Sequence, residues 1–197
     1  MVQRTAICGL ICIGAACASS RLPPPPGPPA PPPEYVVESS SEQSSRLKVP
    51  IEARSGSGIS GKAELIEVDD GVMVVVQVKD MPPGWHGVHI HENADCSAPD
   101  ASSAGEHFNP EGHPHALPSD ERKHLGDLGN LVTVGPAGEG RLQVTVPGAT
   151  LEPGDARSLV NRALVVHAER DTGEQPSGDA GARVGCAELK VSAAGPV

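Results

Sequence analysis

The stretch Gly-Trp-His-Gly-Val-His-Ile-His-Glu, Gly84–Glu92, decides which fold this chain can adopt. Polar and apolar side chains alternate along it, which predicts a β-strand because successive side chains of a strand point to opposite faces. His89 and His91 would share one face, while Val88 and Ile90 would point from the other face into a core. A His-x-His pair on one face can chelate a metal, but the pair alone does not establish a metal site.

Working outward, further segments have the β-branched or alternating composition of strands and are separated by glycine- and proline-rich turns. Together with Trp85–Glu92, their predicted ranges are Arg46–Arg54, Gly58–Glu67, Val72–Val78, Leu128–Val134, Gly140–Val146, Ala163–Ala168 and Val184–Val191. No segment shows convincing helical periodicity. The sequence therefore predicts an all-β domain of eight antiparallel strands, which form a sandwich or a barrel.

Composition divides the 197 residues into unequal parts. Residues 22–33 are nearly all proline and residues 39–45 are small and polar, so neither segment can bury a core. We predict a signal peptide over residues 1–18, a Pro/Ser-rich disordered tether over 19–45, one domain over 46–192 and a tail over 193–197. With aromatic residues at only 2%, the core must be aliphatic.

The N-terminus resembles an export signal, because the apolar run Thr5–Ala16 is too short to span a bilayer well. Two ways of processing remain open. Ile13–Cys17 resembles a bacterial lipoprotein box with Gly14 in place of the usual branched aliphatic residue, and Cys17 would then be lipidated. Cleavage after Ala18 would instead release a free protein. The long tether favours the anchored form, and we expect an exported protein of the periplasm or cell envelope.

Charge and cysteine usage narrow the class of protein further. The formal net charge of −10 argues against nucleic acid or an anionic membrane surface as a partner, because both require a basic surface. Any contact with a membrane would then depend on a lipid at Cys17.

Outside the N-terminal segment only Cys96 and Cys186 remain, and in an oxidising compartment the simplest outcome is one disulfide between them. Two unpaired buried thiols are the alternative.

The histidines cluster strongly: seven of the eight lie within residues 84–130, and His167 follows in an apolar run. One long segment without predicted regular structure carries three histidines and an aspartate, namely His107, His115, His124 and Asp127. Such loops are uncommon in compact domains unless they are functional or held in place. Three imidazoles and a carboxylate form a closed set that suits structural Zn²⁺. The remaining His89, His91 and His167 suit Cu²⁺, so the pattern predicts a two-metal site.

Five motifs occur here in the order in which they occur in the copper/zinc superoxide dismutases, and the resemblance covers about Ser45–Val191. The motifs are Gly87–Glu92, Glu106–Pro110, His124–Asn130, Val165–Ala168 and Gly181–Cys186. The resemblance implies a Greek-key fold with long metal-binding loops and one copper and one zinc ion per subunit. It also implies that two superoxide anions and two protons are converted to O₂ and H₂O₂ by a monomer or homodimer. Cys96 closely follows His91, as in bacterial, exported members.

The resemblance further implies roles for individual residues. The copper ligands would be His89, His91, His107 and His167. The zinc ligands would be His107, His115, His124 and Asp127. His107 would bridge both ions and relay a proton, while Asp171 would accept hydrogen bonds from one copper and one zinc histidine. Arg183 would attract and hold superoxide, and Cys96 with Cys186 would form the family disulfide.

One departure from the family concerns the segment between His167 and Arg183. It is shorter than the usual electrostatic loop and contains no lysine. We therefore predict weaker long-range steering of superoxide and a rate that depends less steeply on salt. The alternative to an enzyme is a non-catalytic protein of the same fold that buffers or presents copper and zinc. The complete copper set and Arg183 favour the enzyme.

Overall fold

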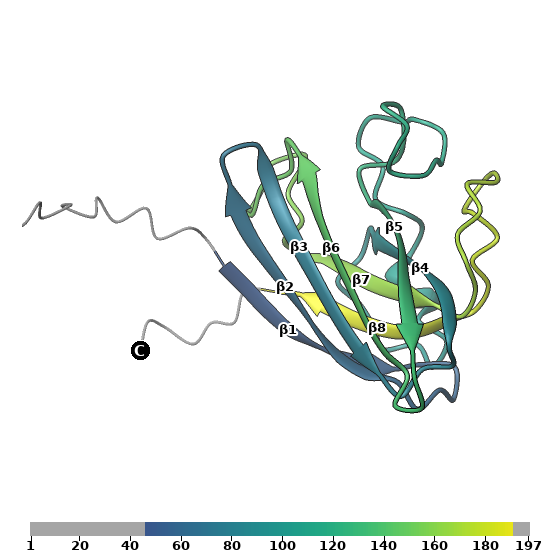
Figure 1. The fold of residues 1–197 in the computed structure, drawn as a ribbon. Helices are drawn as coiled ribbons and strands as arrows, with labels where there is room; N and C mark the ends of the chain where they lie inside the picture. The colour runs from purple at the N-terminus through teal and green to yellow at the C-terminus, as the bar shows by residue number, and fades with distance from the viewer. Residues whose placement is uncertain (1–45, 191–197) are drawn as a thin grey trace, which may run out of the picture. The chain divides into compact units, whose positions relative to one another are not determined.

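Eight strands follow one another along residues 46–190, the part of the chain that the computed structural model describes (Figure 1). They are β1 (Arg46–Ala53), β2 (Ser60–Val68), β3 (Gly71–Lys79), β4 (Gly84–His91), β5 (Asp127–Val134), β6 (Glu139–Pro147), β7 (Arg162–His167) and β8 (Arg183–Leu189). The one helical element in these residues is a single 3-10 turn, η1 (Ser102–Ala104). Every predicted strand is present, with bounds shifted by two residues at most.

The strands close into one antiparallel barrel in the order β1-β2-β3-β6-β5-β4-β7-β8, and β8 pairs back onto β1. The first three strands form a meander, and so do β4, β5 and β6. The connections from β3 to β4 and from β6 to β7 cross over other strands, as in a Greek key. The structure thus confirms the eight-stranded all-β prediction and shows a barrel.

Alternation along the strands separates an inner from an outer set of side chains. In β7, Leu164 and Val166 belong to the aliphatic core inside the barrel. Ala163 and Val165 point outward and pack in a second buried cluster with Cys96, Ala101, Ala104 and Cys186. Because loop residues cover this outer face, β7 is buried on both sides.

Strand β4 is likewise buried on both faces, and this positions the histidines. Val88 and Ile90 lie in the core, as predicted, whereas His89 and His91 point outward and yet have no exposed surface. The loops at residues 92–126 and 168–182 lie on the same side of the barrel as this outer face (Figure 1). They convert an outer surface of the barrel into a second, polar interior.

The predicted disulfide is confirmed: Cys96 and Cys186 are bonded, with their Cα atoms 5.9 Å apart. It joins the loop at residues 92–126 to β8. The predicted signal peptide, the tether, Cys17 and the C-terminal tail lie outside the described residues. Within residues 46–190, no helix is long and apolar enough to cross a membrane.

Candidate metal centre

Strand register brings most of the predicted site residues together in pairs. The pairs are His89 with Asp127, His91 with His107, and His167 with Arg183. The first and last pairs lie at irregularities of the β4–β5 and β7–β8 ladders, where the register shifts. Such bulges re-aim a side chain relative to the regular pleat. Backbone pairing therefore accounts for much of the site, and the loops complete it.

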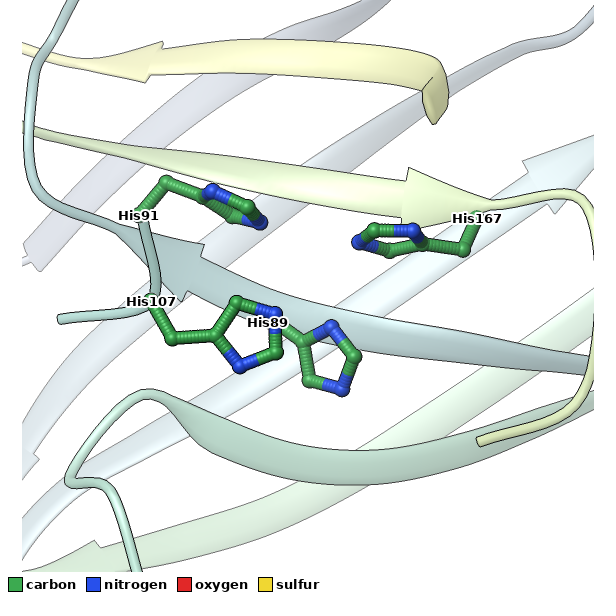
Figure 2. A group of neighbouring side chains, drawn as sticks. All are labelled: His89, His91, His107 and His167. Atoms are coloured by element: carbon green, nitrogen blue, oxygen red, sulfur yellow. The ribbon is translucent and has the colours of Figure 1, made fainter. Parts of the chain in front are cut away.

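The four predicted copper ligands form one buried group, in which the candidate ligand atoms all lie within 4.8 Å of one another. Figure 2 shows their rings turned toward a common region, with His91 facing His167 and His89 beside His107. The ring centroids of His89 and His107 are 4.0 Å apart. None of the four residues is more than 5% exposed.

Three of these rings have one nitrogen engaged and the other free of any hydrogen bond. His91 Nδ1 donates to Gly105 O (2.9 Å), His167 Nδ1 to Gly181 O (3.2 Å) and His89 Nε2 to Asp171 Oδ2 (2.9 Å). The opposite atoms, His89 Nδ1, His91 Nε2 and His167 Nε2, are buried and have no hydrogen-bond partner. A neutral imidazole that donates through one nitrogen presents a lone pair at the other. The donor set therefore fits copper.

Burial keeps these rings neutral. Desolvation lowers the pKa of His89 to about 4 and that of His167 to about 3, and it also lowers the pKa of His91. All three imidazoles are thus unprotonated at neutral pH, so copper would meet lone pairs and would not have to displace protons from them.

Three imidazoles converge on a single oxygen of Asp127. Its Oδ1 lies 2.9 Å from His107 Nδ1, 3.0 Å from His115 Nδ1 and 3.3 Å from His124 Nδ1. Its Oδ2 accepts hydrogen bonds from the main-chain N–H groups of Ala116 and His124, both at 3.1 Å. Burial would raise the pKa of Asp127, but its hydrogen bond with His107 and the close approach of His115 outweigh that effect and hold the pKa well below its usual range.

The predicted zinc ligands are gathered here, with His124 at the edge of the group. The set of ligand atoms within 4.8 Å of one another contains His89, His107, His115 and Asp127, and does not include His124. The Nδ1 atoms of His115 and His124 are close to Asp127 but have no partner with hydrogen-bond geometry. Nitrogens that approach a carboxylate without hydrogen bonding to it are arranged as ligands around a shared cation. Three nitrogens and one oxygen fit zinc.

Asp171 joins the two groups, as the resemblance implied. Fully buried, it accepts hydrogen bonds from His89 Nε2 (2.9 Å) and His115 Nε2 (3.0 Å) through its two carboxylate oxygens. Burial would raise the pKa of Asp171, but these two hydrogen bonds lower it. Burial would lower the pKa of His115, yet the carboxylates of Asp127 and Asp171 raise it to about 9.

Arg183 begins β8 opposite His167 and is partly buried. Its Nη1 donates to Ala101 O at 2.9 Å, which fixes one side of the guanidinium fork. Burial and the neighbouring histidines are the larger causes of the lowered pKa of His91 and His167, and the positive charge of Arg183 lowers both pKa values further. A fixed positive charge therefore lies beside the copper group.

A family model of copper/zinc superoxide dismutases matches residues 59–189. The chain belongs to the copper/zinc superoxide dismutase family. Superoxide dismutase [Cu-Zn] 2 of Aquifex aeolicus is 39% identical over 153 residues, which are 75% of this chain and 89% of the relative. Superoxide dismutase [Cu-Zn] 1 of the same organism is 39% identical over 135 residues, which are 66% and 79% of the two chains.

Solved structures agree with this assignment. A SOD-like protein from Bacillus subtilis is 31% identical, with a TM-score of 0.63 over 73% of this chain and 97% of that protein. The clock protein EA4 is also 31% identical, with a TM-score of 0.65 over 74% and 95% of the two chains. As a copper/zinc superoxide dismutase homologue, the chain is a member of an oxidoreductase family, and copper and zinc are its cofactors. Which side chain ligates which ion stays a prediction.

Sequence reasoning missed two residues that hold this candidate metal centre in place. The side-chain amide of Asn130 bonds the main-chain N–H and C=O of Asp171, at 2.8 and 2.9 Å. Asn130 ends one of the family motifs, so a signal was present. Gln175 makes the equivalent pair of bonds to His115. No pattern marks Gln175, which is one polar residue in a polar loop.

Proposed function

We propose that this protein is a catalytically active superoxide dismutase of the cell envelope. The enzyme would protect the envelope from superoxide formed outside the cytoplasm. One observation carries the proposal of activity. Three unpartnered, buried imidazole nitrogens face a common region together with His107. Beside them, Arg183 of β8 is the strand-pairing partner of His167 of β7. This combination offers both a copper site and a cation for a small anionic substrate.

In this proposal the chain's own residues bind, orient and deliver protons. Bound copper would supply the redox change, by accepting an electron from one superoxide and returning it to a second, while zinc would supply a fixed positive charge. The guanidinium of Arg183 has donors left after its bond to Ala101 and can hold superoxide by charge-assisted hydrogen bonds. His107 faces Asp127 through Nδ1, so Nε2 is the atom that would hold a proton for the second superoxide.

A metal-buffering protein of the same fold is the second candidate, because some solved relatives are described only as SOD-like. A buffer needs ligand atoms but has no use for a guanidinium fixed beside them. The position of Arg183 therefore supports the enzyme.

Activity is tested on the purified full chain by combining metal analysis with a superoxide-consumption assay. We expect consumption by the copper/zinc-loaded protein and none by a copper-depleted, zinc-loaded sample. Arg183→Gln should keep both metals and lower the rate by on the order of 10-fold or more, since it removes the attracting charge. Arg141→Gln, an exposed residue of β6, is the matched control. A protein that is fully loaded with copper and zinc and consumes no superoxide would leave the buffer as the function.

Export is supported by the sequence of residues 1–18 and by the disulfide, since disulfides persist in oxidising compartments. Cell fractionation tests it, and mass spectrometry of the mature N-terminus distinguishes a lipidated Cys17 from a chain that begins after Ala18. Recovery of the full-length chain from the cytoplasm alone would contradict export.

A further inference from the structure

The loop at residues 168–182 binds the main chain and the ring of His115, one of the four predicted zinc ligands. We call these four residues, His107, His115, His124 and Asp127, the zinc group. Gln175 Oε1 accepts a hydrogen bond from the main-chain N–H of His115 (3.2 Å), and Gln175 Nε2 donates to its carbonyl oxygen (2.5 Å). Asp171, from the same loop, accepts a hydrogen bond from Nε2 of the His115 ring. The main chain and the side chain of His115 are therefore both held by a segment that is distant in sequence.

Within residues 46–190, Gln175 is the sole hydrogen-bond partner of the main-chain N–H and C=O of His115. Among the described residues, the N–H and C=O of His115 make no backbone–backbone hydrogen bond, because the segment around it belongs to no strand. His115 is 1% exposed. Removal of the amide would leave a donor and an acceptor unpaired at a buried residue, and a buried peptide group rarely stays unpaired. The main chain of His115 would have to move to find other partners.

The loop approaches the ring of His115 so closely that only glycine fits at one position. Gly178 has φ +80°, and a Cβ there would lie 2.1 Å from Asp171 Oδ1 and 2.7 Å from His115 Nε2. The loop therefore packs directly on the hydrogen bond between these two side chains. A small displacement of the His115 main chain would be transmitted to its Nδ1, which lies 3.0 Å from Asp127 Oδ1.

We infer that Gln175 is a positioning residue of the zinc group, which acts through the main chain of His115 to keep Nδ1 in place beside Asp127. The inference rests on the zinc role assigned above to His115. It gives the short, lysine-free loop a task other than steering superoxide. Zinc affinity should depend on a side chain that does not touch the ion.

The loop at residues 92–126, which carries His115, offers a matched control. Asn109 makes the equivalent two bonds to the main chain of His113, at 3.0 and 2.8 Å. His113 belongs to neither group of candidate ligands. Loss of the Asn109 amide therefore loosens the loop two residues away from His115 without releasing His115 itself.

The test is zinc transfer from the copper/zinc-loaded full chain to a chelator of known affinity, together with the absorption spectrum of Co²⁺ placed at the zinc site. Gln175→Met should weaken zinc binding by about 10- to 100-fold, the range typical of lost partners of metal ligands, and should shift the Co²⁺ bands. Gln175→Glu keeps the acceptor but loses the donor, so an intermediate loss is expected. Asn109→Leu should match the parent in both measurements.

Parental zinc affinity and Co²⁺ bands in Gln175→Met would overturn the inference. An equal loss in Asn109→Leu would also overturn it, because the effect would then be general loosening of the loop. If Gln175→Met does not fold, Gln175→Glu is judged against the parent in the same way. His115→Ala tests the zinc role of His115 separately from the role of Gln175. If it keeps parental zinc affinity, the zinc assignment itself is wrong, whereas weak zinc binding in His115→Ala alone leaves only the role of Gln175 refuted.

Discussion

At the scale of the residue, two buried carboxylates decide the charge of the surrounding imidazoles. Asp127 and Asp171 both contact His115 and raise its pKa to about 9. His89 has Asp171 alone as a hydrogen-bonded carboxylate and His167 has none, so desolvation dominates and their pKa values are about 4 and 3. In the metal-free protein His115 therefore carries a proton at neutral pH, whereas His89 and His167 do not.

This asymmetry predicts how metal binding depends on pH. Zinc must displace the proton of His115 below about pH 9, so we expect apparent zinc affinity to rise roughly tenfold per pH unit between neutral pH and that value. His89 and His167 are already unprotonated there and should cause no such rise for copper. Chelator competition at a series of pH values measures both affinities. Zinc affinity that is constant from pH 7 to 9 would contradict the assignment of His115.

The same shift sets the sign of a stability effect in the metal-free protein. The pKa of His115 is raised above its ordinary value of 6.5, so its ion pairs stabilise the fold fully below that pH. This contribution is lost as the pH rises through about 9, since the folded protein then gives up the proton that it had retained.

At the scale of the element, loops that lack regular structure are fixed by a few strong links. The disulfide ties residues 92–126 to β8, and the main-chain carbonyl and N–H of Cys96 are both hydrogen-bonded as well. Arg54 Nε donates to Cys96 O (2.7 Å), and Cys96 N–H donates to Glu188 Oε1 (2.9 Å). Because these hydrogen bonds do not depend on the S–S bond, the folded loop should keep its position without it.

Removal of the disulfide should therefore act mainly on the unfolded chain. The bridge spans a sequence separation of 90 residues, for which the chain-entropy model gives a loss of about 4 to 5 kcal/mol in the free energy of unfolding. The double variant Cys96→Ser, Cys186→Ser, compared with the parent by denaturant unfolding at equal metal content, measures the loss. A double variant as stable as the parent would contradict this account.

At the scale of the whole molecule, the sequence predicts what depends on short-range patterns. Alternation and turn glycines located all eight strands, and motif spacing selected the candidate ligand residues that the structure brings together, including His167 far from the others. The choice of a barrel over a sandwich depends on β1–β8 pairing such as Glu52 with Cys186, which no local pattern encodes. The ladder irregularities at His89 and His167 and the grip of Gln175 on His115 depend on contacts between distant segments, so they emerge only in the folded structure.

Charge distribution over the molecule bears on how superoxide arrives. The net charge is −10, and the loop before Arg183 contains no lysine but does carry Glu169, Glu174 and Asp179. Attraction should therefore come mainly from Arg183 at short range, where salt screens little. We expect the rate of dismutation to vary only weakly with ionic strength, measured by direct decay of superoxide in increasing NaCl. A steep fall with salt would show that long-range steering operates here after all.

In the proposed enzyme, the imidazoles around His167 form the redox site, distinct from the zinc group. His167 belongs to the copper group and not to the set around Asp127, so His167→Ala should leave zinc binding and the fold intact. The most direct measurement is the superoxide-consumption rate of His167→Ala, taken together with its copper and zinc contents and those of the parent. We expect a parental zinc content and a rate reduced to that of the copper-depleted protein. Consumption at the parental rate by His167→Ala would contradict this assignment.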